Sequence, residues 1–276
     1  MTDLAVVNPE ELSKLASILG ATQERSAGNS RLPELKINAQ ADDDDGNPLP
    51  RPSFYLKGQA QTVYADPVQF RPLSHHYQWL HYDPEANKLV NKTRMVKNFR
   101  EEARDIKGGV KCGKPPYKVM QELPDEERER FREITLFRQV RGLVSYTGKT
   151  VAGEEVVIEN VPCILMLKGS NYSAFESDYM DKLPSGAAIY DYEITLSAKR
   201  NKNGSVTWFT FVYGETTKVP MSKDAYDTML VIAEMITKEN KQVDDAYFDA
   251  IRSDSIDDGA IDALGDALDA DFEDVA

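Results

Sequence analysis

A succession of short strand-like segments between residues 53 and 213 constrains the fold of this chain more than any other feature. Apolar or aromatic residues alternate with polar ones in these segments. Tyr77, Trp79 and His81, for example, share one face because successive strand side chains point to opposite sides. Turn residues such as Asn203-Gly204 separate the segments. About eight short strands with few helical patterns predict a mainly β (β+α) fold, a partly closed antiparallel barrel.

Composition divides the chain into four parts. Residues 1–52 combine a short helix that begins at Asn8-Pro9 with a polar, proline-rich linker, and residues 53–220 form the β-rich core. Residues 221–252 carry apolar side chains at helical spacing, which predicts one long amphipathic helix that closes the core. Residues 253–276 are predicted to be a disordered acidic tail.

The net charge of −13 is distributed unevenly. Residues 254–276 contain nine carboxylates and no Lys or Arg, and residues 42–45 add a second acidic run. Residues 92–118 contain nine cations and three carboxylates, and a charged helix is predicted after them over 121–132. With the acidic segments set apart, the core is close to neutral and can carry a basic face for an anionic ligand.

Several classes of function are disfavoured by the residues present. The chain has no apolar run of about 18 residues and no signal-peptide pattern, so we expect a cytoplasmic protein, in the host cytoplasm if a phage encodes it. Gly108 to Lys114 follows the P-loop pattern until Pro115 replaces the hydroxyl residue that binds Mg²⁺. A nucleotide-dependent enzyme would have to act through Lys114. We therefore expect a binding protein rather than an enzyme, with no cofactor.

Metal binding is a further alternative, which the sequence leaves open. His75, His76, His81, Cys112 and Cys163 are the candidate ligands, but no Cys-x-x-Cys pair is present, and adjacent histidines on a strand point to opposite faces. The two cysteines lie far apart in sequence and predict neither a disulfide framework nor a zinc knot, which fits a reducing compartment. No metal site is predicted.

Aromatic and basic residues recur together along the core. Single-stranded nucleic acid favours this combination, because cations neutralise phosphates while flat rings stack on unpaired bases at about 1 to 3 kcal/mol per base. An aromatic residue on a strand is more often part of the core, so the hypothesis rests on the recurrence. The predicted nucleic-acid contacts are Tyr77, Trp79, Tyr82, Lys92, Arg94, Lys97, Arg100, Lys111, Lys114, Lys118, Phe137, Arg138, Arg141, Lys199, Arg200, Lys202 and Trp208.

The tail carries its own pattern. Ile261, Leu264, Leu268 and Phe272 recur at spacings of three and four among aspartates, so the tail can present an apolar stripe to a groove on a partner. Its negative charge also mimics a nucleic-acid strand and can occupy a basic groove in cis. A purely solubilising tail is the alternative. The predicted partner-binding residues are Leu264, Leu268, Asp271, Phe272, Glu273 and Asp274.

With the tail sequence DALDADFEDVA at residues 266–276, the chain resembles the single-stranded-DNA-binding proteins of tailed bacteriophages and bacteria. These proteins pair an OB-type barrel with an acidic C-terminus that holds an aromatic residue. The resemblance covers the chain from about Ser53 onward; residues 108–114 and 138–143 also look like a phage-protein pattern. It implies an OB-like barrel and a tail that binds replication proteins. The aromatic often lies nearer the end in that family, whereas Val275 and Ala276 follow here.

The leading hypothesis is a protein that coats and protects single-stranded DNA during phage or cellular DNA replication, recombination and repair. Its tail would recruit a polymerase, helicase or primase, and a homo-oligomer is possible. The alternative is a phage structural or assembly protein whose acidic tail controls self-association.

Overall fold

The computed structural model describes residues 32–43 and 46–273, with side chains described as far as Ser253. The short helix predicted at Asn8-Pro9 and much of the predicted linker lie outside this range. Within the segment predicted as linker, strand β1 (Glu34–Ile37) pairs with two other strands, and its Leu35 side chain is buried. The core therefore begins before residue 53, because Leu35 and Ile37 alternate with polar residues and both pack on the main core.

Eight strands form one sheet in the order β2-β1-β6-β5-β3-β7-β8, and β4 also pairs with β3. The contact between β1 and β6 is parallel, whereas every other strand pair of the described chain is antiparallel. After β1 the strands are β2 (Phe54–Lys57), β3 (Val68–Asp83), β4 (Lys88–Lys92), β5 (Ile134–Lys149), β6 (Glu155–Leu167), β7 (Tyr192–Asn203) and β8 (Val206–Lys218).

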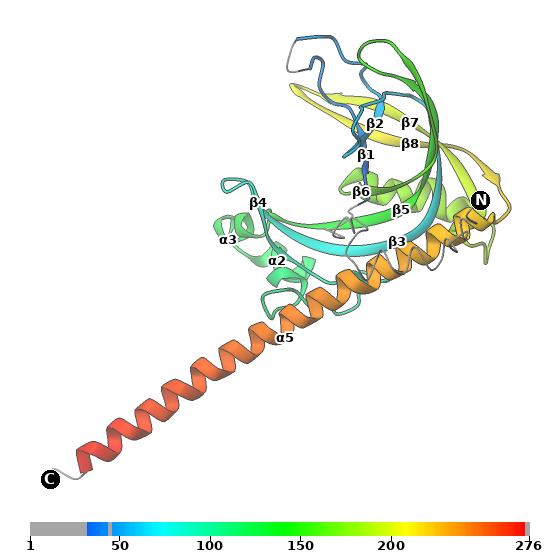
Figure 1. The fold of residues 1–276 in the computed structure, drawn as a ribbon. Coiled ribbons are helices and arrows are strands. Elements are labelled where there is room, and N and C mark those ends of the chain that lie inside the picture. Colours follow the sequence, from blue (N-terminus) through cyan, green and yellow to red (C-terminus); the bar gives the residue numbers. More distant parts are fainter. Residues whose placement is uncertain (1–31, 44–45, 274–276) are drawn as a thin grey trace, which may run out of the picture. The chain divides into compact units, whose positions relative to one another are not determined.

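The long strands β3 and β5 bend strongly and curl the sheet into a half-barrel (Figure 1). A β-bulge shifts their register between Pro72 and Ser74, and bulges bend a strand. At Gly142, which is paired with Pro72, a Cβ atom would lie 2.2 Å from the carbonyl oxygen of Arg71 and 2.7 Å from the Phe70 ring. Only glycine permits this approach. The mainly β, strongly curled sheet agrees with the predicted partly closed barrel.

The main hydrophobic core lies inside the curl of the sheet. It joins side chains from every strand except β4, such as Phe70 on β3 and Val140 on β5, to the buried rings of Phe175 and Tyr179. A second, smaller core holds Tyr77 and Trp79 together with residues of the loop that follows β4. The two cores cover most of the same face of β3, so this strand contributes buried rings along much of its length.

Short helices fill the connections between strands. The charged helix predicted over 121–132 is two helices, α2 (Tyr117–Glu122) and α3 (Asp125–Arg130). They are separate because Pro124 lacks a backbone N–H and disfavours helical backbone at Leu123, whose ψ is 147°. The other helical segments are Lys111–Gly113, α4 (Ser170–Ala174), Phe175–Tyr179, Met180–Lys182 and Ile189–Asp191.

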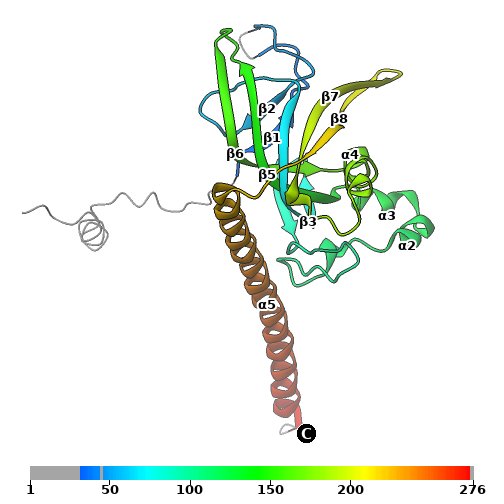
Figure 2. The same ribbon diagram turned by 90° about the vertical axis from the view of Figure 1, so that its right-hand side faces the viewer.

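The long helix α5 (Lys223–Glu273) packs its first part against the outer face of the half-barrel (Figures 1 and 2). Ile232 and Val243 are buried, and the side chain of Asn240 both accepts from the Met95 amide at 2.7 Å and donates to its carbonyl at 3.0 Å. The sequence predicted that the helix would end at residue 252 and that a disordered tail would follow. The helix instead continues to Glu273, in keeping with the helical spacing of apolar residues in the tail.

The hairpin between β7 and β8 turns one residue later than predicted. Asn203 still pairs with Val206 in the ladder, so the corner is Gly204-Ser205, and Gly204 adopts the positive φ of 59° that the turn needs. None of the helices in the described residues combines the length and the apolar character needed to cross a membrane.

Candidate nucleic-acid interface

The two ends of the sheet approach each other without pairing, which leaves one side of the barrel open. β2 and β8 are the first and last strands of the sheet order. Across the opening, the ring centres of Phe54 and Phe211 lie 5.6 Å apart, and the Phe211 amide donates to the side-chain oxygen of Asn171 at 3.0 Å. Side-chain contacts therefore hold β8 near β1 and β2. In a closed barrel, backbone hydrogen bonds would join the two ends of the sheet at this place.

Beyond this contact, β7 and β8 continue as a two-stranded arm, residues 197–212. β7 pairs with β3 only through Ile194–Leu196, so the rest of the hairpin pairs only with itself and extends away from β3 (Figure 2). Directly opposed residues of an antiparallel pair share a face. Arg200 therefore shares a face with Phe209, and Lys199 shares the opposite face with Trp208 through the adjacent pairs.

The charge of the arm is entirely positive. Lys199, Arg200 and Lys202 are its charged residues, and the sequence has no carboxylate from residue 194 to residue 214. Lys199, Arg200, Lys202 and Trp208 are all exposed, with Trp208 at 40%. These four predicted contacts lie on one hairpin, two on each of its faces, and are accessible to a ligand.

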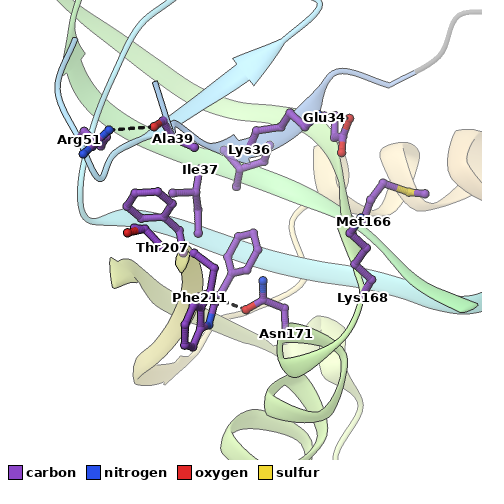
Figure 3. A pocket seen from close by; sticks show the side chains of 13 residues that line it. Glu34, Lys36, Ile37, Ala39, Arg51, Met166, Lys168, Asn171, Thr207 and Phe211 are labelled. Atoms are coloured by element: carbon purple, nitrogen blue, oxygen red, sulfur yellow. Dashed lines mark hydrogen bonds and ion pairs between the residues drawn. The ribbon is translucent and has the colours of Figure 1, made fainter. Parts of the chain in front are cut away.

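A groove of about 560 Å³ lies between β1 and the arm, here called the β1–β8 groove. Figure 3 shows Lys36 and Ile37 of β1 on one side of it and Thr207 and Phe211 of β8 on the other. Three aromatic and three cationic side chains contribute to its lining, with one carboxylate. The lining residues are Glu34, Leu35, Lys36, Ile37, Ala39, Arg51, Met166, Lys168, Asn171, Thr207, Trp208, Phe209 and Phe211.

One cation of the groove lies beside a ring, and another is paired with a carboxylate. The Arg51 guanidinium is 5.9 Å from the centre of the Phe209 ring and donates to the Ala39 carbonyl at 3.2 Å. Lys36 forms an ion pair with Glu34 at 3.5 Å. Cations and flat apolar rings at one concave surface can neutralise phosphates and stack bases at the same time.

Sequence reasoning did not select Lys36, Arg51, Lys168 or Phe209 as site residues. The first two fall in the segment predicted as linker. The proline-rich run around Arg51 is typical of a linker, so the sequence offered no reason to place Arg51 in the folded core. Lys168 directly follows β6 and lies 5.8 Å from the ring of Phe137, a predicted contact that is half-buried. Phe209 follows the basic residues of the hairpin together with Trp208 and Phe211, and this aromatic and basic neighbourhood was the signal for it.

Four predicted contacts, Tyr77, Trp79, Arg138 and Arg141, are buried, with exposed fractions between 2% and 7%. The Arg138 guanidinium lies 5.0 Å from the Tyr77 ring and 4.8 Å from the Tyr172 ring, and it forms an ion pair with Glu176. Arg141 pairs with Glu239 of α5 at 3.4 Å. These side chains stabilise the fold and have no surface to offer a ligand in this conformation.

The basic stretch 92–118 is only partly available. Arg94 pairs with Asp244 of α5 at 3.3 Å, and the Lys111 ammonium lies 5.1 Å from the Trp79 ring. Lys114 donates to the carbonyl of Ile134, and burial lowers the pKa of its ammonium. Lys92 is half-buried, whereas the predicted contacts Tyr82, Lys97, Arg100 and Lys118 are exposed.

The glycine-rich loop that resembles a P-loop is built around Asp105. This carboxylate is 1% exposed and accepts from the amides of Lys107 at 3.0 Å, Gly109 at 3.1 Å and Cys112 at 3.0 Å. In a P-loop such amides surround a phosphate. Here the Asp105 carboxylate takes the place that an anionic ligand would need.

The candidate metal ligands do not form a cluster of three or more among the residues whose placement is described. Burial, followed by the charges of Arg141, His75 and Lys97, lowers the pKa of His76 to about 4. Burial also lowers the pKa of His75, and it raises the pKa of the Cys112 thiol to about 12. His81 lies 3.2 Å from a carboxylate oxygen of Glu133.

The predicted partner-binding residues of the tail lie outside the described side chains. Leu264 to Glu273 fall on the last turns of α5, and Asp274 lies beyond the described chain.

Comparisons with known proteins give no match: no family model fits the sequence, no curated protein is similar to it, and no solved structure resembles the fold.

Proposed function

We propose that this chain binds single-stranded DNA in the β1–β8 groove and along the arm, as an OB-like member of the single-stranded-DNA-binding proteins. The single observation that carries the proposal is the accessible set of rings and cations at the open side of the half-barrel. Trp208 and Phe209 offer rings on which bases can stack. The Arg51 guanidinium lies beside the Phe209 ring, and Arg200 shares a face of the hairpin with Phe209. Unpaired bases can reach such rings, whereas bases stacked within a duplex cannot.

The salt dependence of binding follows from the number of cations. The groove contributes Lys36, Arg51 and Lys168, and the arm contributes three more. If all six contact phosphates, log K against log salt has a slope of about −4, because each phosphate contact on a single strand contributes about −0.7. A triple alanine variant of the arm cations removes about 2 from the magnitude of that slope.

The test is a titration of fluorescent oligo(dT) with the full chain at several salt concentrations. Wild type should bind, and Trp208→Ala should weaken binding about fivefold or more by loss of one stacking ring. Tyr226→Ala is the matched control, because Tyr226 is an exposed aromatic on α5, at the outer face of the barrel. A duplex of equal length should bind less tightly. Absence of oligo(dT) binding at low salt refutes the proposal, and self-assembly without DNA binding would favour a structural role.

We further propose that residues 255–276 recruit replication proteins during DNA replication, recombination and repair. The support is the eight carboxylates of this segment and the apolar residues that recur at helical spacing among them. Deleting residues 255–276 should tighten DNA binding at low salt, because a competing polyanion is lost, and should abolish capture of the polymerase, helicase or primase. An unchanged affinity at all salt concentrations would contradict the competition.

A further inference from the structure

A second exposed ring lies outside the β1–β8 groove, in the loop that follows β4. Phe99 is 42% exposed, and the Arg100 guanidinium lies 5.6 Å from its ring centre. The ring of Tyr77 meets Phe99 nearly edge-on from the buried side, with 5.9 Å between centres and 69° between planes. Lys97 on the same loop is exposed as well. The arrangement is a flat ring supported by Tyr77 and accompanied by the Arg100 guanidinium, with a second exposed cation, Lys97, on the same loop.

The loop that carries Phe99 is held in place on both sides. The side-chain oxygen of Asn98 accepts from the Arg100 amide at 2.9 Å, next to the ring. Further along the loop, Arg104 lies against the rings of Tyr247 and Phe248 of α5, at 5.2 and 5.4 Å. A ring on a fixed loop loses little conformational freedom when a ligand stacks on it.

Two carboxylates follow Phe99 in the sequence, and they would offset the positive charge near the ring if they lay beside it. Glu101 and Glu102 are both exposed, and Glu102 lies 3.8 Å from Arg104, on the side of the loop that contacts α5. Arg100 therefore keeps a positive charge beside the Phe99 ring, and Lys97 adds a second exposed cation on the same loop.

Ring contacts connect Phe99 through Tyr77 to Tyr172, which is the sequence neighbour of the groove residue Asn171. Tyr77 lies 5.8 Å from Tyr172 as well as 5.9 Å from Phe99, so the centres of Tyr172 and Phe99 are separated by less than about 12 Å. Tyr172 directly follows Asn171, which lines the groove and accepts from the Phe211 amide. A strand that leaves the groove at Asn171 can therefore reach Phe99 by passing over Tyr172, a half-buried ring.

We infer that Phe99, with Arg100 and Lys97, is a second stacking site for the same single strand, and that the binding track runs from the groove over Tyr172 to Phe99. The inference rests on the proposed DNA binding at the groove and extends the length of single strand that the protein contacts. At a rise of about 3.4 Å per stacked nucleotide, the step from Tyr172 to Phe99 corresponds to at most about three nucleotides.

The test uses oligo(dT) of about 4 to about 16 nucleotides, the range that single domains occupy. Phe99→Ala should leave the affinity for the shortest bound oligomers unchanged and weaken the longest by about fivefold or more. The occluded length in a stoichiometric titration should fall, by up to about three nucleotides. Phe99→Trp, which keeps a flat ring, should behave like wild type, and Arg100→Ala should reduce the salt slope for long oligomers only.

The outcomes separate this inference from the proposed function. Trp208→Ala should weaken oligomers of every length, because its ring is at the groove. If Phe99→Ala weakens none of them, or weakens short and long ones equally, the second site is refuted while the groove stands. If wild type binds no oligomer, both fail. Tyr226→Ala and an unchanged unfolding midpoint of Phe99→Ala control for loss of structure.

Discussion

Replacement of Asp105 tests whether one buried carboxylate organises the loop between β4 and α2. Its Oδ1 accepts from the amides of Lys107 and Gly109, and its Oδ2 accepts from the amide of Cys112. The φ angles of Lys111 and Cys112 are 54° and 57°, an uncommon region for residues other than glycine. Asp105 thus supports a backbone path that the sequence does not favour locally.

The expected loss in the free energy of unfolding follows from the number of backbone N–H groups that lose their acceptor. A buried N–H without an acceptor costs about 1 to 3 kcal/mol, and Asp105→Ala leaves three of them. Because some donors will reach water once the loop relaxes, we expect the free energy of unfolding to fall by about 3 to 5 kcal/mol. Asp105→Asn keeps the oxygen that serves two amides but sets an NH₂ group against the Cys112 amide. This variant should lose about 1 to 3 kcal/mol.

Urea unfolding followed by far-ultraviolet circular dichroism measures both changes, provided the m-value stays constant. Asp83 is the matched control, since its carboxylate also accepts two amides, from Glu85 and Ala86 at 2.9 Å, in an exposed turn. Water replaces those bonds, so Asp83→Ala should cost under about 1 kcal/mol. If Asp105→Ala costs no more than Asp83→Ala, the reasoning about the buried carboxylate is wrong.

Two further predictions concern the strands. His76 has a pKa of about 4 in the fold and about 6.5 when unfolded, so the unfolded state binds more protons between these values and stability falls as pH decreases through them, by at most about 3 kcal/mol. His76→Gln should remove this part of the pH dependence in urea unfolding, and an unchanged profile would contradict the assignment. Gly142→Ala should destabilise the protein by about 3 kcal/mol or more, because its Cβ would lie 2.2 Å from the Arg71 carbonyl oxygen. Gly214→Ala, where the nearest atom is 3.1 Å away, should cost clearly less in thermal unfolding, and equal costs would count against a steric origin.

Local patterns predicted much of the architecture. Alternation of apolar and polar residues identified the strands from β2 onward, and helical spacing identified the first part of α5, whereas β1 was assigned to the linker. The arm was also accessible to sequence reasoning, because its cations, its aromatic residues and its glycine turn lie within one hairpin. Pro124 could have indicated the break between α2 and α3, since the residue before a proline disfavours helix.

Burial of the predicted contacts depended on distant parts of the chain. Alternation placed Tyr77 and Trp79 on one face of β3, but it could not show that the loop after β4 and α4 covers that face. Arg141 is buried because Glu239, almost one hundred residues later, lies over it. A local pattern indicates which side chains share a face, and it carries no information about what packs on that face.

The sequence alone determined that this chain forms a partly closed β-structure with a basic hairpin, an amphipathic helix after residue 221 and an acidic C-terminal segment, because backbone preferences and charge act between near neighbours. Only the tertiary structure decided where a ligand can reach those residues. The β1–β8 groove joins Lys36 to Phe209, which lie far apart in the chain. In the basic stretch 92–118, Arg94 is engaged by α5, Lys111 by a ring and Lys114 by a carbonyl. Accessibility is a property of packing between distant segments, and packing is set by the whole fold.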